Sequence, residues 1–201
     1  VARGRNMTLS IARSELILGG QKSGKSRRAE LLAAQWLAAH PAHRALLVAT
    51  AEAGDEALRQ RIARHQSDRA ARVPRMQTLE EPHDLARVLL QHSAPDTLIV
   101  VDCLTLWLTH WLFQHDEKFE QKEALAPDWQ AQAALFFEAL AKTPGPVVLV
   151  GNEIGLGVIP LGREVRAFVD ALGLVNQQAA QACERVTLMV AGLPLFLKGA
   201  P

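Results

Sequence analysis

Lysine and serine side chains end a glycine-rich stretch near the N-terminus, where their spacing indicates phosphate chemistry. The stretch is Gly19-Gly20-Gln21-Lys22-Ser23-Gly24-Lys25-Ser26, and it follows the apolar residues 16–18. This is the P-loop pattern, in which backbone N–H groups surround phosphate oxygens, the lysine reaches the β- and γ-phosphates and the serine hydroxyl binds Mg²⁺. A chance glycine-rich turn is the alternative. Because the preceding strand, the spacing and the following helix all agree, we predict that the protein binds a nucleoside triphosphate.

Asp102 is the second residue whose position indicates chemistry. It directly follows the apolar residues 98–101, which are typical of a buried strand. A carboxylate at the end of such a strand is placed to hold Mg²⁺, directly or through water, beside Ser26. The alternative is an ordinary N-cap of the helix that begins near Leu104. Given the P-loop, we predict that Ser26 and Asp102 form the metal-binding pair.

His65 lies at the end of a predicted helix, residues 55–65, and the residues alone leave its role open. An imidazole can act as a nucleophile, but a lone histidine on a polar helix face is more often simply solvated. Six other histidines occur, at positions 40, 43, 83, 92, 110 and 115, and composition does not favour His65 over them.

The segment 152–160 combines polar residues with two glycines directly after a predicted strand. It fits a loop that closes on a ligand as well as it fits a flexible connector. It is not the Asn-Lys-x-Asp guanine reader of regulatory GTPases, and residues 102–105 lack their Asp-x-x-Gly switch. The sequence therefore disfavours a GTPase switch protein.

Apolar runs alternate with helical periodicity along the chain, and this alternation predicts the elements that position the site. It implies one α/β domain with a mostly parallel central sheet, helices on both faces and ligands at the carboxyl edge. Residues 14–201 are expected to form this P-loop NTPase-like domain, after an N-terminal extension of residues 1–13. The expected strands are 16–18, 45–50, 75–79, 97–102, 146–151, 186–191 and a possible antiparallel edge strand, 195–198. The expected helices are 26–39, 55–65, 84–92, 104–113, 129–141 and 161–183.

The charge balance and the cysteines exclude several classes of function. The chain carries 22 Lys and Arg against 21 Asp and Glu, a net charge of +1. This balance gives no electrostatic case for nucleic acid or for an acidic membrane surface, and no apolar run is long enough to span a bilayer. Cys103 and Cys183 lie far apart in apolar segments, which predicts buried free thiols. We therefore expect a cytoplasmic protein that binds neither nucleic acid nor membrane.

Taken together, these stretches resemble the adenosylcobinamide kinase/adenosylcobinamide-phosphate guanylyltransferase family of cobalamin biosynthesis. The resemblance covers nearly the whole chain, from about residue 16 to residue 198. Its segments are Gly19-Gly20-x-x-Ser23-Gly24-Lys25-Ser26-Arg27, Arg61-Ile62-Ala63-x-His65, Asp102-Cys103-Leu104-Thr105-Leu106-Trp107-Leu108-Thr109, Asn152-Glu153-x-Gly155-x-Gly157-x-Ile159-Pro160, Asn176-Gln177 and Val190-Ala191-Gly192-Leu193-Pro194.

The resemblance implies a bifunctional enzyme that works on adenosylcobinamide. It would first phosphorylate the aminopropanol hydroxyl of adenosylcobinamide with ATP or GTP. It would then transfer GMP from GTP to that phosphate through a GMP-histidine intermediate, giving adenosylcobinamide-GDP and pyrophosphate. The resemblance also implies a homo-oligomer, such as a trimer. The alternatives are another small-molecule P-loop kinase without guanylyl transfer and a partner-regulated P-loop NTPase.

The P-loop and the family matches together give the candidate site residues. His65 matches the family's nucleophile, and Lys25 is the second catalytic candidate. Ser26 and Asp102 are the candidates for Mg²⁺. The candidate nucleotide-binding residues are Gly19, Gly20, Gln21, Lys22, Ser23, Gly24, Lys25, Ser26, Thr50, Ala51, Glu52, Gln66, Ser67, Asp68, Arg69, Glu80 and Asp102.

Overall fold

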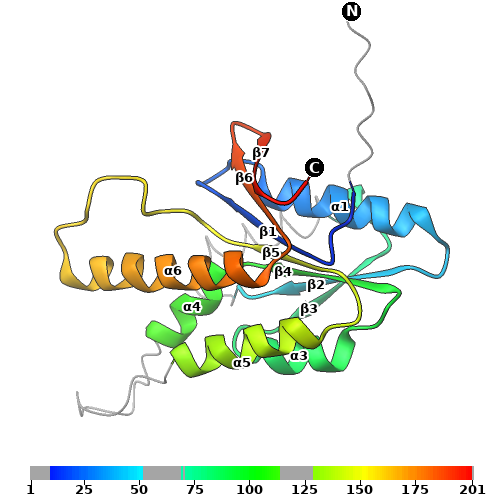
Figure 1. The fold of residues 1–201 in the computed structure, drawn as a ribbon, viewed down its shortest axis with the longest axis horizontal. Coiled ribbons are helices and arrows are strands. Elements are labelled where there is room, and N and C mark those ends of the chain that lie inside the picture. The colour runs from blue at the N-terminus through cyan, green and yellow to red at the C-terminus, as the bar shows by residue number, and fades with distance from the viewer. Residues whose placement is uncertain (1–9, 52–68, 70, 114–128, 201) are drawn as a thin grey trace, which may run out of the picture.

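The computed structural model describes residues 10–51, 69, 71–113 and 129–200. It contains one seven-stranded sheet in the order β3-β2-β4-β5-β1-β6-β7, in which only the β6–β7 pairing is antiparallel (Figure 1). The predicted α/β class, the parallel sheet and the antiparallel edge strand are confirmed. The strands are β1 (Ser14–Gly19), β2 (Arg44–Ala49), β3 (Met76–Glu80), β4 (Thr97–Asp102), β5 (Val147–Val150), β6 (Arg185–Val190) and β7 (Leu193–Lys198).

Helices cover both faces of the sheet, as predicted. In Figure 1, α1 lies on one side of the sheet, while α3, α4, α5 and α6 lie on the other. Alternate residues of a strand point to opposite faces, so Leu16 and Leu18 of β1 pack into one apolar cluster and Ile17 packs into the other. The helices are α1 (Lys25–Ala39), α3 (Leu85–His92), α4 (Leu104–Leu112), α5 (Trp129–Lys142) and α6 (Arg163–Ala182).

The predicted elements within the described residues are present, with small differences at their ends. β1 begins at Ser14 rather than at Leu16, because the polar side chains of Ser14 and Glu15 are buried with partners. β7 begins at Leu193 and includes Pro194, which an edge strand tolerates because its outer N–H groups need no partner. The predicted helix 55–65 lies outside the described residues. Cys103 and Cys183 are free and buried, as predicted.

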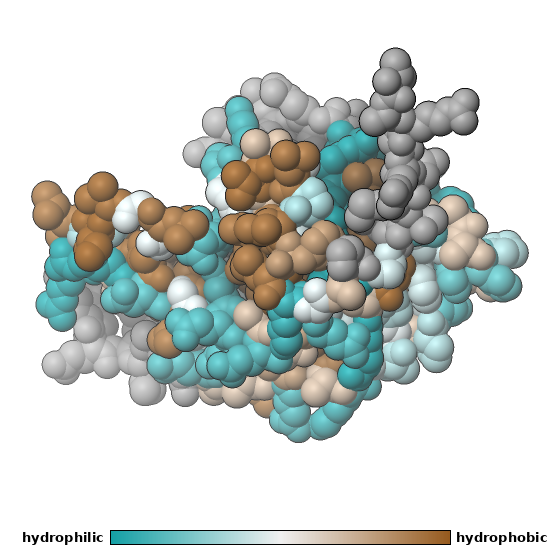
Figure 2. Space-filling model, turned by 45° about the horizontal axis from the view of Figure 1, so that its top comes forward, coloured by the Kyte–Doolittle hydropathy of each residue, from teal (hydrophilic) through white to brown (hydrophobic). Residues whose placement is uncertain are grey.

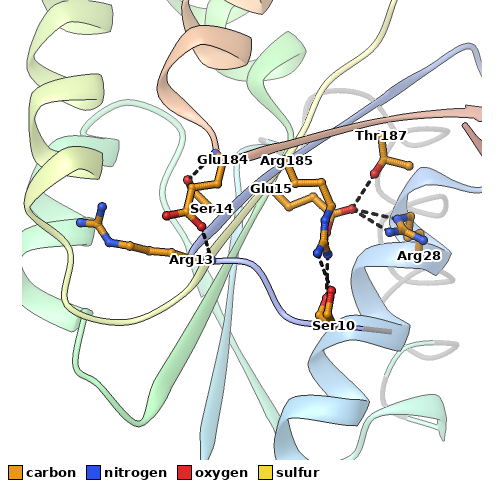
Figure 3. Close-up of polar contacts among 8 residues, drawn as sticks. All are labelled: Ser10, Arg13, Ser14, Glu15, Arg28, Glu184, Arg185 and Thr187. Carbon is orange, nitrogen blue, oxygen red and sulfur yellow. Dashed lines mark hydrogen bonds and ion pairs between the residues drawn. The ribbon is translucent and has the colours of Figure 1, made fainter. Parts of the chain in front are cut away.

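A buried cluster of charges joins β1, α1 and β6 at the start of the P-loop strand (Figure 3). The Glu15 side chain is only 2% exposed, and its Oε1 accepts hydrogen bonds from Arg28 Nε at 3.0 Å and Thr187 Oγ1 at 2.8 Å. Its other oxygen, Oε2, accepts from Arg185 Nη1 at 3.1 Å. Arg185 also donates to Ser10 O at 2.6 Å, so residue 10 is attached to the domain. The cluster therefore fixes the first turn of α1 against two strands.

Replacing Glu15 with alanine is expected to lower the free energy of unfolding by about 3–5 kcal/mol, because two buried guanidinium groups lose their shared carboxylate. Urea titration followed by far-UV circular dichroism measures this loss. Glu138→Ala is the matched control, since Glu138 pairs with Lys142 at 2.7 Å on the surface and both side chains are more than 60% exposed. That substitution is expected to change the free energy of unfolding by less than about 1 kcal/mol. Equal effects of the two substitutions would contradict the prediction.

Candidate nucleotide site

The P-loop connects β1 to α1 and contains two glycines whose positive φ angles and close neighbours disfavour a side chain. At Gly19 the backbone φ is +152°, and an added Cβ would lie 2.6 Å from the carbonyl oxygen of Met189. At Gly24, which precedes α1, φ is +103° and an added Cβ would lie 3.3 Å from Gly192 Cα. Gly192 N also donates to Ser23 O at 3.0 Å. The turn between β6 and β7 therefore packs directly against the P-loop and is hydrogen-bonded to it.

Two side chains of the P-loop present hydrogen-bond donors that suit a phosphate. Lys25 is 9% exposed, and its Nζ donates to Gly20 O at 2.7 Å, so the amino group lies over the loop. Ser23 Oγ is buried and has no hydrogen-bond partner among the described residues. A buried hydroxyl without a partner is unfavourable, and a phosphate oxygen is an acceptor that would satisfy it.

The electrostatics of Lys25 link the P-loop to Asp102. Burial lowers the pKa of Lys25, while negative charge at Cys103 and Asp102 acts in the opposite direction. Burial also raises the pKa of the Cys103 thiol to about 11, so this thiol is uncharged near neutral pH. The Asp102 carboxylate is therefore the group that favours the charged ammonium of Lys25 at neutral pH. An anionic phosphate would favour it further.

Asp102 ends β4, and the strand register places it level with the ends of neighbouring strands. Ala49 of β2 pairs with both Asp102 and Glu80, so the carboxylates of β4 and β3 lie on either side of β2 at the carboxyl edge. Thr50 fixes the turn after Asp102: its Oγ1 donates to Cys103 O at 2.7 Å and accepts from Cys103 N at 2.8 Å. Thr50 therefore holds the backbone at Cys103 through both of these bonds.

The loop after β5 lies between the P-loop and Asp102, because β5 separates β1 from β4 in the sheet. Glu153 N donates to Gly19 O at 3.1 Å, and Asn152 N donates to Thr105 Oγ1 at 3.0 Å. Asn176 of α6 also donates through Nδ2 to Asn152 O, at 3.0 Å. The start of this loop is therefore anchored, which excludes a loosely attached connector at residues 152 and 153.

The structure brings together the predicted site residues that it describes. The P-loop, Thr50 and Asp102 lie at one edge of the sheet, together with Glu80 on the neighbouring side. Burial lowers the pKa of Arg69, and the nearby Asp102 carboxylate partly offsets this effect, so these two side chains interact. Ala51 directly follows Thr50 and is half-buried. The remaining candidates, Glu52, His65, Gln66, Ser67 and Asp68, lie outside the described residues.

The sequence did not predict the residues whose side chains fix the loop after β5 and the first turn of α1. Thr105 accepts the N–H of Asn152, and Glu15 with Arg28 fixes the first turn of α1. The signal for Glu15 was its position directly before the apolar residues 16–18, because a carboxylate that is buried in such a strand needs a partner. Thr105 gave no such signal, because a threonine in the first turn of a helix is common.

Most of the chain matches the model of one enzyme family. Residues 15–197 match the family model described as cobinamide kinase / cobinamide phosphate guanyltransferase. The chain belongs to this family. It accordingly has the family's two activities, phosphorylation of cobinamide and guanylyl transfer to cobinamide phosphate.

Curated relatives of the family align with almost their full length. The chain is 46% identical over 187 residues to the bifunctional adenosylcobalamin biosynthesis protein CobP of Pseudomonas aeruginosa. This alignment covers 93% of this chain and 98% of that protein. It is 33% identical over 187 residues to the corresponding protein CobU of Salmonella typhimurium, covering 91% of this chain and 98% of that protein. The predicted family and the bifunctional activity are confirmed.

Among solved structures, the flagellar accessory protein FlaH of Methanocaldococcus jannaschii has a similar fold. The TM-score is 0.50 at 12% identity, with 94% of this chain and 80% of that chain covered. At this identity the likeness concerns the fold alone. No helix within the described ranges is long and apolar enough to cross a membrane.

Proposed function

We propose that one nucleotide site at the carboxyl edge of the sheet serves both reactions of the family. The observation that carries this proposal is the P-loop itself, in which Lys25 Nζ donates to Gly20 O at 2.7 Å and the Ser23 hydroxyl is buried without a partner among the described residues. Both reactions break a phosphoanhydride bond of a nucleoside triphosphate. The same P-loop therefore suits both reactions, although the γ-phosphorus reacts in the kinase step and the α-phosphorus reacts in the transferase step.

In the kinase step the alcohol oxygen of adenosylcobinamide attacks the γ-phosphorus of ATP or GTP. The bond from the γ-phosphorus to the bridging oxygen breaks, the nucleoside diphosphate leaves, and the alcohol proton passes to solvent. Lys25 and the backbone N–H groups of the P-loop stabilise the charge on the transferred phosphoryl group and on the leaving diphosphate. No covalent contribution from the protein is needed in this step.

In the transferase step neutral imidazole of His65 attacks the α-phosphorus of GTP. The bond between the α-phosphorus and the bridging oxygen breaks, and pyrophosphate leaves while the P-loop neutralises its charge. A phosphate oxygen of adenosylcobinamide phosphate then attacks the phosphorus of this GMP–histidine. The new phosphorus–oxygen bond forms as the phosphorus–nitrogen bond breaks, giving adenosylcobinamide-GDP and the free histidine. His65 is assigned from the family pattern around Arg61-Ile62-Ala63.

We further propose that Ser26 and Asp102 hold Mg²⁺ together with the phosphates. Hydroxyl and carboxylate oxygens are suitable ligands, and the effect of the Asp102 charge on the pKa of Lys25 supports a position near the P-loop. Within the described ranges no group of three or more His, Cys, Asp or Glu forms a metal site by itself. Phosphate oxygens and water would supply the other ligands, as is usual for Mg²⁺. The metal would neutralise charge on the phosphates.

The remaining proposals concern assembly and location. We propose a homo-oligomer in the cytoplasm, with a trimer as the expected state. The exposed face of β7 supports self-association, because Leu193, Leu195 and Leu197 are all more than half exposed on alternate positions of an edge strand. Figure 2 shows an apolar patch over β6 and β7. A molar mass of one chain in light scattering would exclude the oligomer.

Incubation with GTP labelled at the α-phosphate tests the proposed histidine intermediate and its need for Mg²⁺. We expect protein-bound label that is stable to base and labile to acid, as a phosphorus–nitrogen bond requires, and that is released on addition of adenosylcobinamide phosphate. Chelation of Mg²⁺ with EDTA should abolish labelling, and adding Mg²⁺ back should restore it.

Two results would contradict the proposed function. Phosphorylation of cobinamide without any protein-bound label would show that the histidine intermediate does not form. Label that persists undiminished in excess EDTA would show that Ser26 and Asp102 do not act through a metal.

A further inference from the structure

A trough of about 530 Å³ lies between the loop after β5 and α6. One wall comes from the loop, with Ile154 and Val158, and the other comes from α6, with Val169 and Leu174. Val158 is 96% exposed and Leu174 is 48% exposed, so these aliphatic side chains have few contacts within the described part of the chain. Figure 2 shows the corresponding apolar patch at the left of the molecule. A trough of this volume is in the usual range for small-molecule sites.

The trough begins beside the P-loop. Its Gln177 follows Asn176, whose side chain donates to Asn152 O, and Glu153 N of the same loop donates to Gly19 O. At the other end Arg166 Nη1 donates to Pro160 O at 3.0 Å and also to Leu161 O. The loop is therefore held to the P-loop at one end and to α6 at the other.

The chemistry of the lining does not suit a second nucleotide. The lining contains no lysine, its one arginine, Arg166, bonds to loop carbonyls, and Asp170 adds a negative charge. Phosphates are bound by clusters of cationic side chains, and the lining contains no such cluster. Aliphatic walls with a carboxylate and a carboxamide instead suit a large, mainly uncharged molecule that carries amide groups.

We propose that this trough binds the corrinoid acceptor of both reactions. The proposal rests on the proposed function, in which the P-loop holds the nucleotide. A corrinoid has apolar ring faces and carboxamides around its rim, so the aliphatic walls would contact the ring and Asp170 and Gln177 would bond to the amides. Gln177 marks the end nearest the P-loop, which is where the aminopropanol arm must reach to meet a phosphate. The opposite end, at Arg166, would face the rest of the macrocycle.

Gly173 allows the trough to be filled without disturbing the fold. It lines the trough from within α6, and an added Cβ would meet no atom within 4 Å. Glycine within a helix is about 1 kcal/mol less favourable than alanine, so most replacements at Gly173 should not weaken α6. Gly173→Phe would occupy the trough, whereas Gly173→Ala would leave it open. Val165→Phe adds the same ring to α6 outside the trough, at a side chain that is 52% exposed.

The test measures the KM for cobinamide in the kinase step and the binding of cobinamide by equilibrium dialysis. Gly173→Phe is expected to raise this KM and the corresponding Kd at least ten-fold, while Gly173→Ala and Val165→Phe change them less than two-fold. Labelling by GTP in the absence of acceptor should be unchanged in all three variants, because it needs no corrinoid. Circular dichroism and light scattering show whether fold and molar mass are preserved.

The outcomes separate this proposal from the proposed function. A folded Gly173→Phe enzyme with normal cobinamide KM and Kd would overturn the trough as the acceptor site. A changed molar mass with normal cobinamide binding would also overturn it and identify the trough as a contact between copies. A wild-type protein that is never labelled by GTP would contradict the histidine mechanism instead, while the dialysis measurement would still decide the trough.

Discussion

Replacing Lys25 with alanine is expected to abolish both cobinamide phosphorylation and guanylyl transfer. Lys25 is buried over the P-loop, with Nζ 2.7 Å from Gly20 O, and we propose that it neutralises phosphates in both steps. Loss of one such preorganised charge lowers kcat on the order of 10²–10³-fold or more. If the P-loop serves both reactions, as we propose, the two losses should be similar in size.

Parallel assays measure this effect, one for ADP release with cobinamide and one for pyrophosphate release with cobinamide phosphate. Lys142→Ala is the control, because this lysine lies on the surface with its side chain 63% exposed and pairs only with Glu138 at 2.7 Å among the described residues. It should leave both rates unchanged. Near-normal guanylyl transfer by Lys25→Ala would show that GTP binds elsewhere in that step.

Replacing His65 with alanine should separate the two activities. Guanylyl transfer should fall by more than about 10³-fold, because loss of a covalent nucleophile removes the pathway itself. Cobinamide phosphorylation should remain within a few-fold of wild type, since direct transfer to the alcohol needs no histidine. Labelling by α-labelled GTP and kinase assays on the same preparation measure both.

His92→Ala is the matched control for His65, because His92 is an exposed histidine in the last turn of α3. It should retain labelling and both rates. The nucleophile must be the neutral imidazole, so labelling in wild type should also decline as the pH falls through the pKa of the histidine. Equal loss of both activities in His65→Ala would make the residue a structural or nucleotide-binding group instead.

The positions of the main elements could be predicted because the pattern of each element was local. The P-loop spacing, the apolar run before Asp102 and the helical periodicity of 163–182 each depend on neighbouring residues only. Alternation of strands and helices then places all strand ends at one edge, since parallel strands are joined by right-handed crossovers. The location of Asp102 near the P-loop follows from this topology.

The parts that could not be predicted depend on contacts between distant residues. The partners of Glu15 lie 13 and 170 positions away, at Arg28 and Arg185. The bond from Glu153 N to Gly19 O likewise depends on β5 lying next to β1, which no local pattern encodes. The trough arises where a loop and a helix pass each other, so its lining follows neither a helical nor a strand period.

The loop after β5 is attached to both sides of the nucleotide site through two adjacent N–H groups at its start. Asn152 N bonds to Thr105, three residues beyond Asp102, while Glu153 N bonds to Gly19 in the P-loop. If an acceptor in the trough displaces this loop, both sides of the nucleotide site move with it. Thermodynamic linkage then requires reciprocity: the factor by which the acceptor changes nucleotide affinity is the factor by which nucleotide changes acceptor affinity. Cooperativity between acceptor and nucleotide would thus originate in two adjacent peptide groups.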